Sequence, residues 1–281
     1  MRAVVVDEAG TPRFTDVPEP EGEGELVRVL ACGLCGSDVE KLTPAYAGTV
    51  LGHEVVAATV NGARAVLLHH RPCGRCERCR AGHESTCDEF AAPTIRPGGL
   101  AERARADGTV PVADGTSDAL ATYAEPLACV LRGAERVPRG RVLVVGHGFV
   151  GRLFAAVLRR RGDEVFALDV RPDRSGPAPD GPVDAVVLCA PGGAEAATAS
   201  VAPGGTVLVF ADAGPLPLDP VYRRELHVVG SRSATPRHLR EAVALLPELQ
   251  LPEPTVLPLE RFDEGLERYR RGEALKVVFT P

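Results

Sequence analysis

The sequence predicts an α/β protein in which a β-rich N-terminal domain precedes a doubly wound parallel sheet. Three observations support this fold class. The first third of the chain carries short apolar runs separated by glycine and proline, which is typical of short strands. From residue 119 onward, apolar strands alternate with amphipathic helices, and strands without polar positions indicate a parallel sheet covered on both faces. The length of 281 residues suits two modest domains.

The individual elements follow from the apolar patterns and the breaks between them. A turn-rich stretch at residues 171–182 stands where a further helix would be expected. The predicted elements, in chain order, are an edge strand at residues 1–7, strands at 26–30, 55–60 and 63–68, a helix at 119–135, a strand at 142–145, a helix at 153–161, strands at 165–168, 185–188, 206–210 and 226–231, a helix at 236–246 and a closing strand at 276–279.

Composition and charge exclude several classes of protein. The net charge is −6 and there is no basic block, so nucleic acid is not expected as a partner. No run approaches the roughly 18 apolar residues that a membrane span needs. The N-terminus lacks the apolar core of a signal peptide, which favours a cytoplasmic protein. In that compartment, the eight cysteines indicate metal sites or buried thiols before disulfides.

Four of the cysteines form a compact motif. Cys73, Cys76, Cys79 and Cys87 have the spacing C-x2-C-x2-C-x7-C, in a segment rich in arginine, glutamate and glycine. Such a loop lacks an apolar core, and the bonds from four thiolates to one zinc ion can hold it together. Disulfides and an iron–sulfur cluster are the alternatives. A site closed by four thiolates has no open position, so we expect a structural zinc.

A glycine-rich turn at residues 146–151 matches the pattern G-x-G-x-x-G. It follows an apolar strand and opens an amphipathic helix, which is the context that gives this pattern meaning. Gly146 would allow the tight turn, Gly148 the approach of a pyrophosphate, and Gly151 the packing of helix on strand, with Val150 in the first turn of that helix. The helix N-terminus favours phosphate charge. The turn therefore predicts a dinucleotide site.

Asp169 and Arg171 bear on which dinucleotide binds. Asp169 ends the next strand, 18 residues after Gly151, where a carboxylate can accept hydrogen bonds from the ribose hydroxyls. This carboxylate would repel a 2′-phosphate, so NAD is predicted. Arg171 could pair with a 2′-phosphate, which keeps NADP as the alternative.

Cys35, His53 and Glu54 are candidates for a second, open metal site. Each is a weak signal alone, because a single histidine is more often a structural residue. Their order in the chain, ahead of the four-cysteine motif, strengthens their interpretation as metal ligands. Together these motifs resemble the medium-chain zinc-dependent alcohol dehydrogenase superfamily, nearest its sorbitol and threonine dehydrogenase branch. The resemblance rests on Cys-Gly-Ser-Asp at 35–38, Gly-His-Glu at 52–54, the four cysteines, Gly-Gly-Leu-Ala-Glu at 98–102, Glu-Pro-Leu at 125–127, the glycine turn and Lys-Val-Val at 276–278.

The resemblance implies the ligands of a catalytic zinc. Cys35 and His53 would bind the ion directly, and Glu125 would be the third ligand, either directly or through water. Glu54 follows His53 and could bind zinc when the other ligands rearrange. Cys129, one helical turn after Glu125, is an alternative ligand. The remaining position would hold water or substrate, as a catalytic zinc requires.

Two further residues of the same turn receive roles from the resemblance. Asp38 is expected to orient the imidazole of His53. Ser37 is expected to contact the reacting oxygen of the substrate and to carry its proton outward. Glu40 stands where the family often has the histidine that ends this proton relay, and its role stays open. His69 and His70, just before the four-cysteine motif, are expected to end a strand and face solvent and not to bind metal.

The resemblance also implies the domain plan. Residues 1–127 would form a GroES-like catalytic domain, 128–232 a Rossmann domain that binds NAD, and 233–281 would return to the catalytic domain. The segment between His53 and Cys73 and the one after Asp169 are shorter than is usual in the family. The shortening is expected to remove peripheral strands and a helix and to leave the order of the ligands intact, and a loss of activity is the alternative.

The expected function is hydride transfer between a secondary alcohol and NAD. The alcohol would be a polyol, an aminocyclitol or an amino alcohol, with two zinc ions per chain and a homodimer or homotetramer as the assembly. The partner is a small-molecule alcohol or ketone. Two alternatives stay open: a biosynthetic ketone reductase that uses NADPH, and a degenerate relative that only binds nucleotide.

Overall fold

The computed structural model describes residues 1–112 and 114–281. It has a mixed α/β architecture with one largely antiparallel sheet and one parallel sheet, which confirms the predicted fold class. No helix within the described residues is both long and apolar enough to cross a membrane.

The described chain divides into two compact units. The first unit contains Met1–Ala128, Ala234–Glu248 and Pro252–Pro281. The second unit contains Cys129–Ser233 and Leu249–Leu251. The N-terminal and C-terminal parts of the sequence therefore fold together, and the second unit is built almost entirely from one continuous segment.

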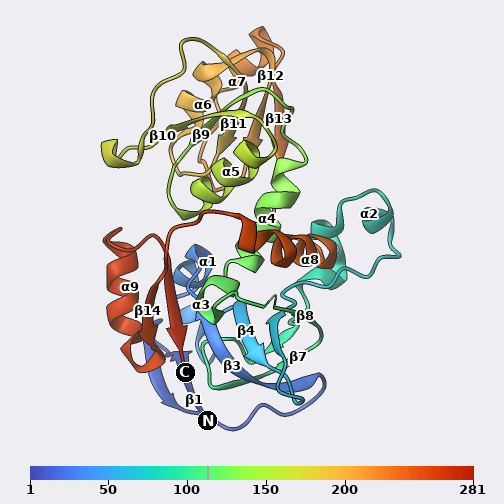
Figure 1. Cartoon of the computed structure of the whole chain (residues 1–281), viewed down its shortest axis with the longest axis vertical. Coiled ribbons are helices and arrows are strands. Elements are labelled where there is room, and N and C mark those ends of the chain that lie inside the picture. Colours follow the sequence, from blue (N-terminus) through green and yellow to red (C-terminus); the bar gives the residue numbers. More distant parts are fainter. Residues whose placement is uncertain (113) are drawn as a thin grey trace. The chain divides into compact units, whose positions relative to one another are not determined.

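A sheet and a separate hairpin organise the first unit (Figure 1). The main strand order is β14-β15-β3-β4-β5-β8, and β7 pairs with both β3 and β6. All neighbours in this sheet are antiparallel except β14 and β15, which are parallel. The hairpin joins β1 and β2. The strands are β1 (Arg2–Val6), β2 (Pro12–Asp16), β3 (Glu25–Gly33), β4 (Glu54–Ala58), β5 (Arg64–Leu67), β6 (Ile95–Arg96), β7 (Arg103–Ala106), β8 (Thr109–Pro111), β14 (Thr255–Pro258) and β15 (Val277–Thr280).

The core of this unit is built mainly from valine, alanine and leucine, because the chain has no tryptophan and only 4% aromatic residues. Helix α9 contributes Phe262, whose ring lies 4.9 Å from the ring of Phe279 on β15. Figure 1 shows α9 lying beside β14. The helices of the unit are α1 (Gly36–Glu40), α2 (Glu77–Arg80), α3 (Asp118–Ala121), α4 (Ala124–Ala134, which continues into the second unit), α8 (Pro236–Leu245) and α9 (Phe262–Arg270), with 3-10 turns at Pro44–Tyr46, Glu84–Thr86, Asp88–Ala91, Leu246–Glu248 and Leu259–Arg261.

The predicted helix at 119–135 is two helices, α3 and α4, with a break at residues 122–123. Pro126 explains the break, because proline lacks an N–H and is tolerated in the first turn of a helix but not in its interior. Tyr123 anchors the break, since its hydroxyl donates to the backbone oxygen of Pro252 over 2.8 Å. The break places Glu125 in the first turn of α4.

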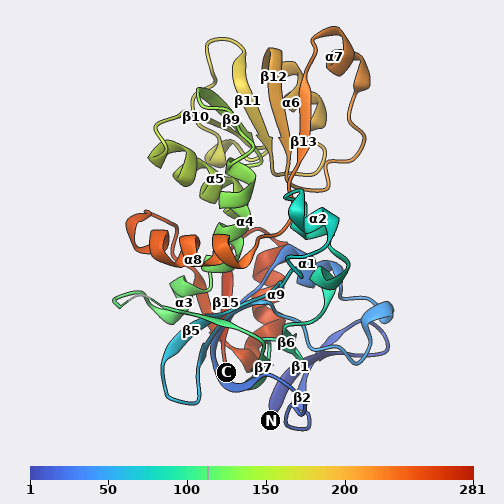
Figure 2. The ribbon, with the colours of Figure 1, turned by 90° about the vertical axis from the view of Figure 1, so that its right-hand side faces the viewer.

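The second unit contains a five-stranded parallel sheet in the order β10-β9-β11-β12-β13. Figure 2 shows these strands side by side, with β10 at one edge and β13 at the other. In sequence order the sheet reads 2-1-3-4-5, so the chain reverses direction across the sheet beside β9, and ligands bind at such points in α/β sheets. The elements are β9 (Arg141–Val145), α5 (Phe149–Arg160), β10 (Glu164–Leu168), a 3-10 turn (Pro172–Arg174), β11 (Val183–Leu188), α6 (Ala194–Ser200), β12 (Val201–Val209), α7 (Leu218–Arg223) and β13 (His227–Gly230).

Candidate active site

A tight turn after β3 carries Cys35, Ser37 and Asp38. Cys35 is the N-cap of α1, and its backbone N–H donates to Oδ2 of Asp38 over 3.1 Å. The other carboxylate oxygen, Oδ1, accepts from the backbone N–H of Gly52 over 3.2 Å. The Ser37 hydroxyl lies 3.4 Å from the sulfur of Cys35. Asp38 therefore ties the cysteine turn to the segment that carries the next site residue.

That next residue is His53, and it faces Asp38. The Nδ1 of His53 lies 3.3 Å from Oδ1 of Asp38, and both side chains are buried. Burial raises the pKa of Asp38, but His53 outweighs it and the pKa is lowered. Burial lowers the pKa of His53, but Asp38 outweighs it and the pKa stands well above its usual value. With Nδ1 turned to the carboxylate, Nε2 is the nitrogen that can bind a metal.

Glu54 and Lys276 form a buried ion pair next to His53. The Lys276 ammonium contacts Oε2 of Glu54 and donates to the backbone oxygen of Leu34 over 3.0 Å. Gly33 makes room for the pair, since a Cβ at this position would lie 2.0 Å from Oε2 of Glu54. Burial raises the pKa of Glu54. Burial lowers the pKa of Lys276, but Glu54 outweighs it and the pKa is raised. Sequence reasoning gave Lys276 no role.

Glu125 is buried in the first turn of α4 and contacts His69. Its Oε1 lies 3.2 Å from Nδ1 of His69. Burial raises the pKa of Glu125, but the hydrogen bond from His69 and the nearby His53 outweigh burial and bring the pKa to about 2. Burial lowers the pKa of His69. The two side chains therefore hold each other in place at the start of α4.

The expectation that His69 and His70 face solvent was wrong. Both residues follow β5, but both are half-buried. The His69 ring stacks on His53 with centroids 4.3 Å apart and lies 3.7 Å from the ring of His70. His70 in turn stacks on Phe90 and contacts its backbone oxygen at 3.0 Å. The polar residues after β5 suggested that the two histidines are exposed. The residues that bury them, His53, Phe90 and Glu125, lie far from them in sequence.

Two overlapping groups of possible metal ligands share His53. One group contains Cys35, His53 and Glu54, and the other contains His53, His69 and Glu125. Within each group the ligand atoms lie within 4.8 Å of one another. Cys35 and Glu125 are in different groups, so His53 is the residue that connects them. Thiolate, imidazole and carboxylate are the donors that zinc takes in proteins, so the donor set fits a zinc ion.

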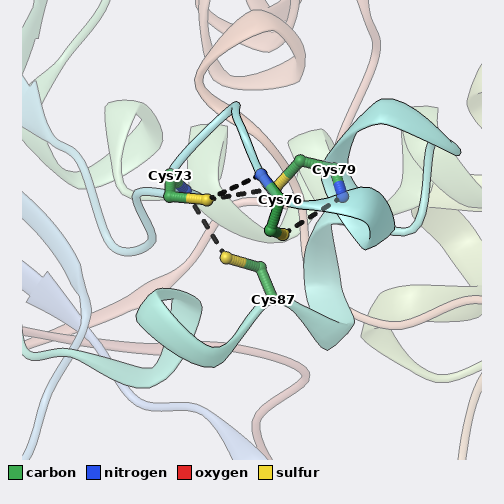
Figure 3. A group of neighbouring side chains, drawn as sticks. All are labelled: Cys73, Cys76, Cys79 and Cys87. Atoms are coloured by element: carbon green, nitrogen blue, oxygen red, sulfur yellow. Dashed lines mark hydrogen bonds between the residues drawn. The ribbon is translucent and has the colours of Figure 1, made fainter.

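The four cysteines of the lobe face one another, as Figure 3 shows. The sulfurs of Cys73, Cys76, Cys79 and Cys87 all lie within 4.8 Å of one another. All four are free thiols, which excludes the disulfide alternative in this structure. Backbone N–H groups point at the sulfurs, and the amides of Arg75 and Cys76 lower the pKa of Cys73 to about 6. This arrangement suits four thiolates around one ion.

The glycine turn joins β9 to α5, as predicted. Gly146 has a φ of +90°, and a Cβ there would lie 2.5 Å from the Cβ of Ala190. A Cβ at Gly151 would lie 2.0 Å from the backbone oxygen of Gly146. A Cβ at Gly148 would meet no atom within 4 Å, so packing does not require glycine there. The open space at Gly148 is what the approach of a pyrophosphate needs. Val150 lies in the first turn of α5.

Asp169 directly follows β10 and is held by backbone amides. Its Oδ2 accepts from the N–H of His147 over 2.8 Å, and its Oδ1 accepts from the N–H of Arg171 over 3.0 Å. The Arg171 guanidinium lies 3.4 Å from a carboxylate oxygen of Asp173. The His147 ring contacts the backbone oxygen of Arg174 at 2.7 Å. The carboxylate is thus fixed at the carboxyl end of the sheet, beside the glycine turn.

Comparisons with known proteins identify the same family that the sequence motifs resemble, the alcohol dehydrogenases. Residues 22–114 match the family model of the alcohol dehydrogenase GroES-like domain. D-altritol 5-dehydrogenase from Agrobacterium fabrum is 32% identical over 304 aligned positions that cover 88% of each chain. Sorbitol dehydrogenase from Halalkalibacterium halodurans is 26% identical over 341 positions, which cover 100% of this chain and 99% of the relative. Both alignments are longer than the 281 residues here, so they place gaps in this chain.

One solved structure has a fold that matches the fold of this chain over its whole length. It is described as a zinc-binding dehydrogenase from Sinorhizobium meliloti 1021 bound to NADP, and it is 26% identical with a TM-score of 0.81, covering 100% of this chain and 99% of that chain. The fold, the donor groups and these relatives define an alcohol dehydrogenase, an enzyme that transfers a hydride between an alcohol and a nicotinamide cofactor. The chain belongs to the zinc-dependent medium-chain alcohol dehydrogenase superfamily, in its sorbitol and threonine dehydrogenase branch.

The Glu54–Lys276 pair generates a stability prediction. Replacing Lys276 with methionine leaves the Glu54 charge buried without its partner, and such a loss costs about 3–5 kcal/mol. We expect the midpoint of thermal unfolding, measured by circular dichroism, to fall in Lys276→Met. The midpoint should recover in part when Glu54→Gln is added. Lys41→Met, at the other lysine of the chain, is the control and should stay close to the wild type. Equal midpoints in both lysine variants would show that the pair does not stabilise the fold.

Proposed function

We propose that the protein is a zinc-dependent polyol dehydrogenase that uses NAD. In this proposal Cys35, His53 and Glu125 bind the catalytic zinc, and Glu54 binds it when the other ligands rearrange. The observation that carries the proposal is that the thiol of Cys35 and the carboxylates of Glu54 and Glu125 all lie near the imidazole of His53. The polyol assignment follows the altritol and sorbitol dehydrogenases to which the chain is similar. Aminocyclitols and amino alcohols belong to the same chemical class of secondary alcohols.

In this proposal, the zinc ion and the side chains around it each have a distinct role in the reaction. A bound zinc ion supplies Lewis acidity, which lowers the pKa of the substrate hydroxyl. Asp38 lies against Nδ1 of His53, which would leave Nε2 as the nitrogen that binds the ion. Ser37, whose hydroxyl lies 3.4 Å from the sulfur of Cys35, would accept the proton from the substrate hydroxyl and pass its own proton outward. A bound NAD would supply the acceptor for the hydride that leaves the substrate carbon.

The cofactor assignment rests on Asp169. Its carboxylate is held by two backbone amides beside the glycine turn, where it can accept hydrogen bonds from the ribose hydroxyls of NAD. The same charge repels a 2′-phosphate. Arg171 would be the residue to favour NADP, but its guanidinium is already turned to Asp173. The NADP bound in the similar solved structure keeps NADP as the second candidate.

The domain roles, the metal content and the assembly complete the proposal. The GroES-like domain, residues 1–127 with the return at 233–281, would carry the catalytic site, and the Rossmann domain at 128–232 would bind the cofactor. Each chain would hold two zinc ions, with the second in the four-cysteine lobe. A cytoplasmic homodimer or homotetramer is proposed by analogy with the family.

Activity and metal binding test the catalytic site. Replacing Cys35 or His53 with alanine should lower NAD reduction by at least about 1,000-fold, because Lewis-acid catalysis contributes several kcal/mol and each 1.36 kcal/mol is tenfold. The assay is NADH absorbance with a panel of polyols and other secondary alcohols. NAD affinity, measured by calorimetry, should stay near that of the wild type. Cys189→Ser is the control, since Cys189 lies in neither donor group. Full activity in Cys35→Ala or His53→Ala would exclude this site.

The number of zinc ions per chain tests whether the four-cysteine lobe binds one of them. Replacing Cys73 with serine should lower the zinc content from two ions to one per chain, measured by mass spectrometry of the metal. It should also lower the unfolding midpoint, since the loop depends on the bonds to zinc. The control Cys189→Ser should retain both ions. A wild-type chain with iron and sulfide in the lobe would support the iron–sulfur alternative instead.

Cofactor preference tests Asp169. The variant Asp169→Asn keeps an acceptor oxygen and removes the charge. Hydrogen bonds to charged groups contribute about 1.5–3 kcal/mol, so NAD should bind roughly 10- to 100-fold more weakly, and NADP should bind more tightly than before. Asp180→Asn, which pairs with Arg141, is the matched control. Tighter NADP than NAD binding in the wild type would favour the NADPH-dependent ketone reductase.

A further inference from the structure

His69 belongs to a donor group that the proposed ligand set does not use. It lies with His53 and Glu125, and the ligand atoms of these three residues are within 4.8 Å of one another. We propose that His69 is a further protein ligand of the catalytic metal, on the side of His53 that carries Glu125. This inference rests on the proposed function, because it concerns the same ion.

The distance between His69 and Glu125 suits a shared metal. Zinc bonds to nitrogen at about 2.0–2.1 Å and to carboxylate oxygen at about 2.0–2.2 Å, so two ligands at tetrahedral positions lie about 3.4 Å apart. Nδ1 of His69 and Oε1 of Glu125 are 3.2 Å apart. This contact is a hydrogen bond without the ion, and the same two atoms can bind an ion with little movement of either side chain.

The main chain around His69 is already fixed. The hydroxyl of Thr94, a buried residue, donates to the backbone oxygen of His69 over 2.6 Å and also contacts that of Leu68. The ring stacks on His53 and lies tilted against His70, with centroids 4.3 and 3.7 Å away. A ligand held in this way loses little conformational freedom when it binds a metal.

Glu54 is less available as the additional ligand than His69. Its Oε2 is bound to the Lys276 ammonium, and both side chains are almost completely buried. Moving Glu54 to the metal would separate the buried Lys276 ammonium from its carboxylate, which is costly, so Glu54 would bind only when the other ligands rearrange. An imidazole also adds a ligand without adding charge, so Cys35, Glu125 and two imidazoles would leave a divalent ion neutral in this buried site. The substrate oxygen would then be a fifth ligand, a number that catalytic zinc sites can reach.

Magnetic resonance on the cadmium-substituted full-length protein tests the ligand directly. With histidine labelled by ¹⁵N, the ¹¹³Cd resonance of the mixed-donor site should couple to two imidazole nitrogens in the wild type. The variant His69→Asn should leave one coupling, and the control His70→Asn should retain two. A single coupled imidazole in the wild type would overturn the proposal. So would two couplings in His69→Asn.

Zinc affinity separates a ligand from a residue that only positions Glu125. An asparagine amide at position 69 can donate to Glu125 in place of Nδ1. If His69 is a ligand, His69→Asn should weaken zinc binding at this site by more than the roughly 10- to 100-fold that loss of an outer partner costs. Wild-type affinity in His69→Asn would assign His69 to positioning alone and overturn the proposal.

The metal count keeps this inference apart from the proposed function. One ion per wild-type chain, bound in the lobe of Cys73, Cys76, Cys79 and Cys87, would refute the proposed function and this inference together. Two ions with one coupled imidazole would refute the inference alone and leave the dehydrogenase site with Cys35, His53 and Glu125 in place.

Discussion

The contact between Asp38 and His53 is the constraint on which the rest of the site depends. Asp38 is buried and receives two backbone N–H groups, one from the turn after β3 and one from the segment before β4. Its position therefore follows from the backbone, and it fixes the ring of His53 in turn. Because His53 belongs to both donor groups, this one contact sets where Cys35 and Glu125 can meet an ion.

The four-cysteine motif and the glycine turn could be predicted because each is built from residues that are close in sequence. The four cysteines lie within 15 consecutive positions, and their sulfurs meet as the spacing predicts. The glycine turn is six residues long, and its strand, turn and helix appear as expected. In both cases the chemistry needs residues that are close in sequence, so no tertiary contact can change the outcome.

The catalytic site was harder to predict because sheet pairing and loop packing assemble it. Strand β3 pairs with β4 and with β15, and the register sets Gly33 opposite both Glu54 and Val278. This pairing brings Lys276 from the end of the chain to Glu54. His69 meets Glu125 across 56 positions of sequence. Neither contact has a signal in the pattern of polar and apolar residues, so both were missed. The family resemblance supplied the proposed ligands but not the residues that contact them.

The topology of the second unit explains how the glycine turn and Asp169 can keep their places in a shortened chain. The turn-rich stretch after Asp169 forms no strand, and β10 is the last strand on that side of the sheet. The N–H of Gly176 donates to the backbone oxygen of Ala167 over 3.0 Å, so the shortened loop pairs with part of the exposed edge. The glycine turn lies on β9, inside that edge, where the strand order reverses. An outer strand can therefore be lost while the turn and the carboxylate of Asp169 keep their places, because they depend on β9 and β10 alone.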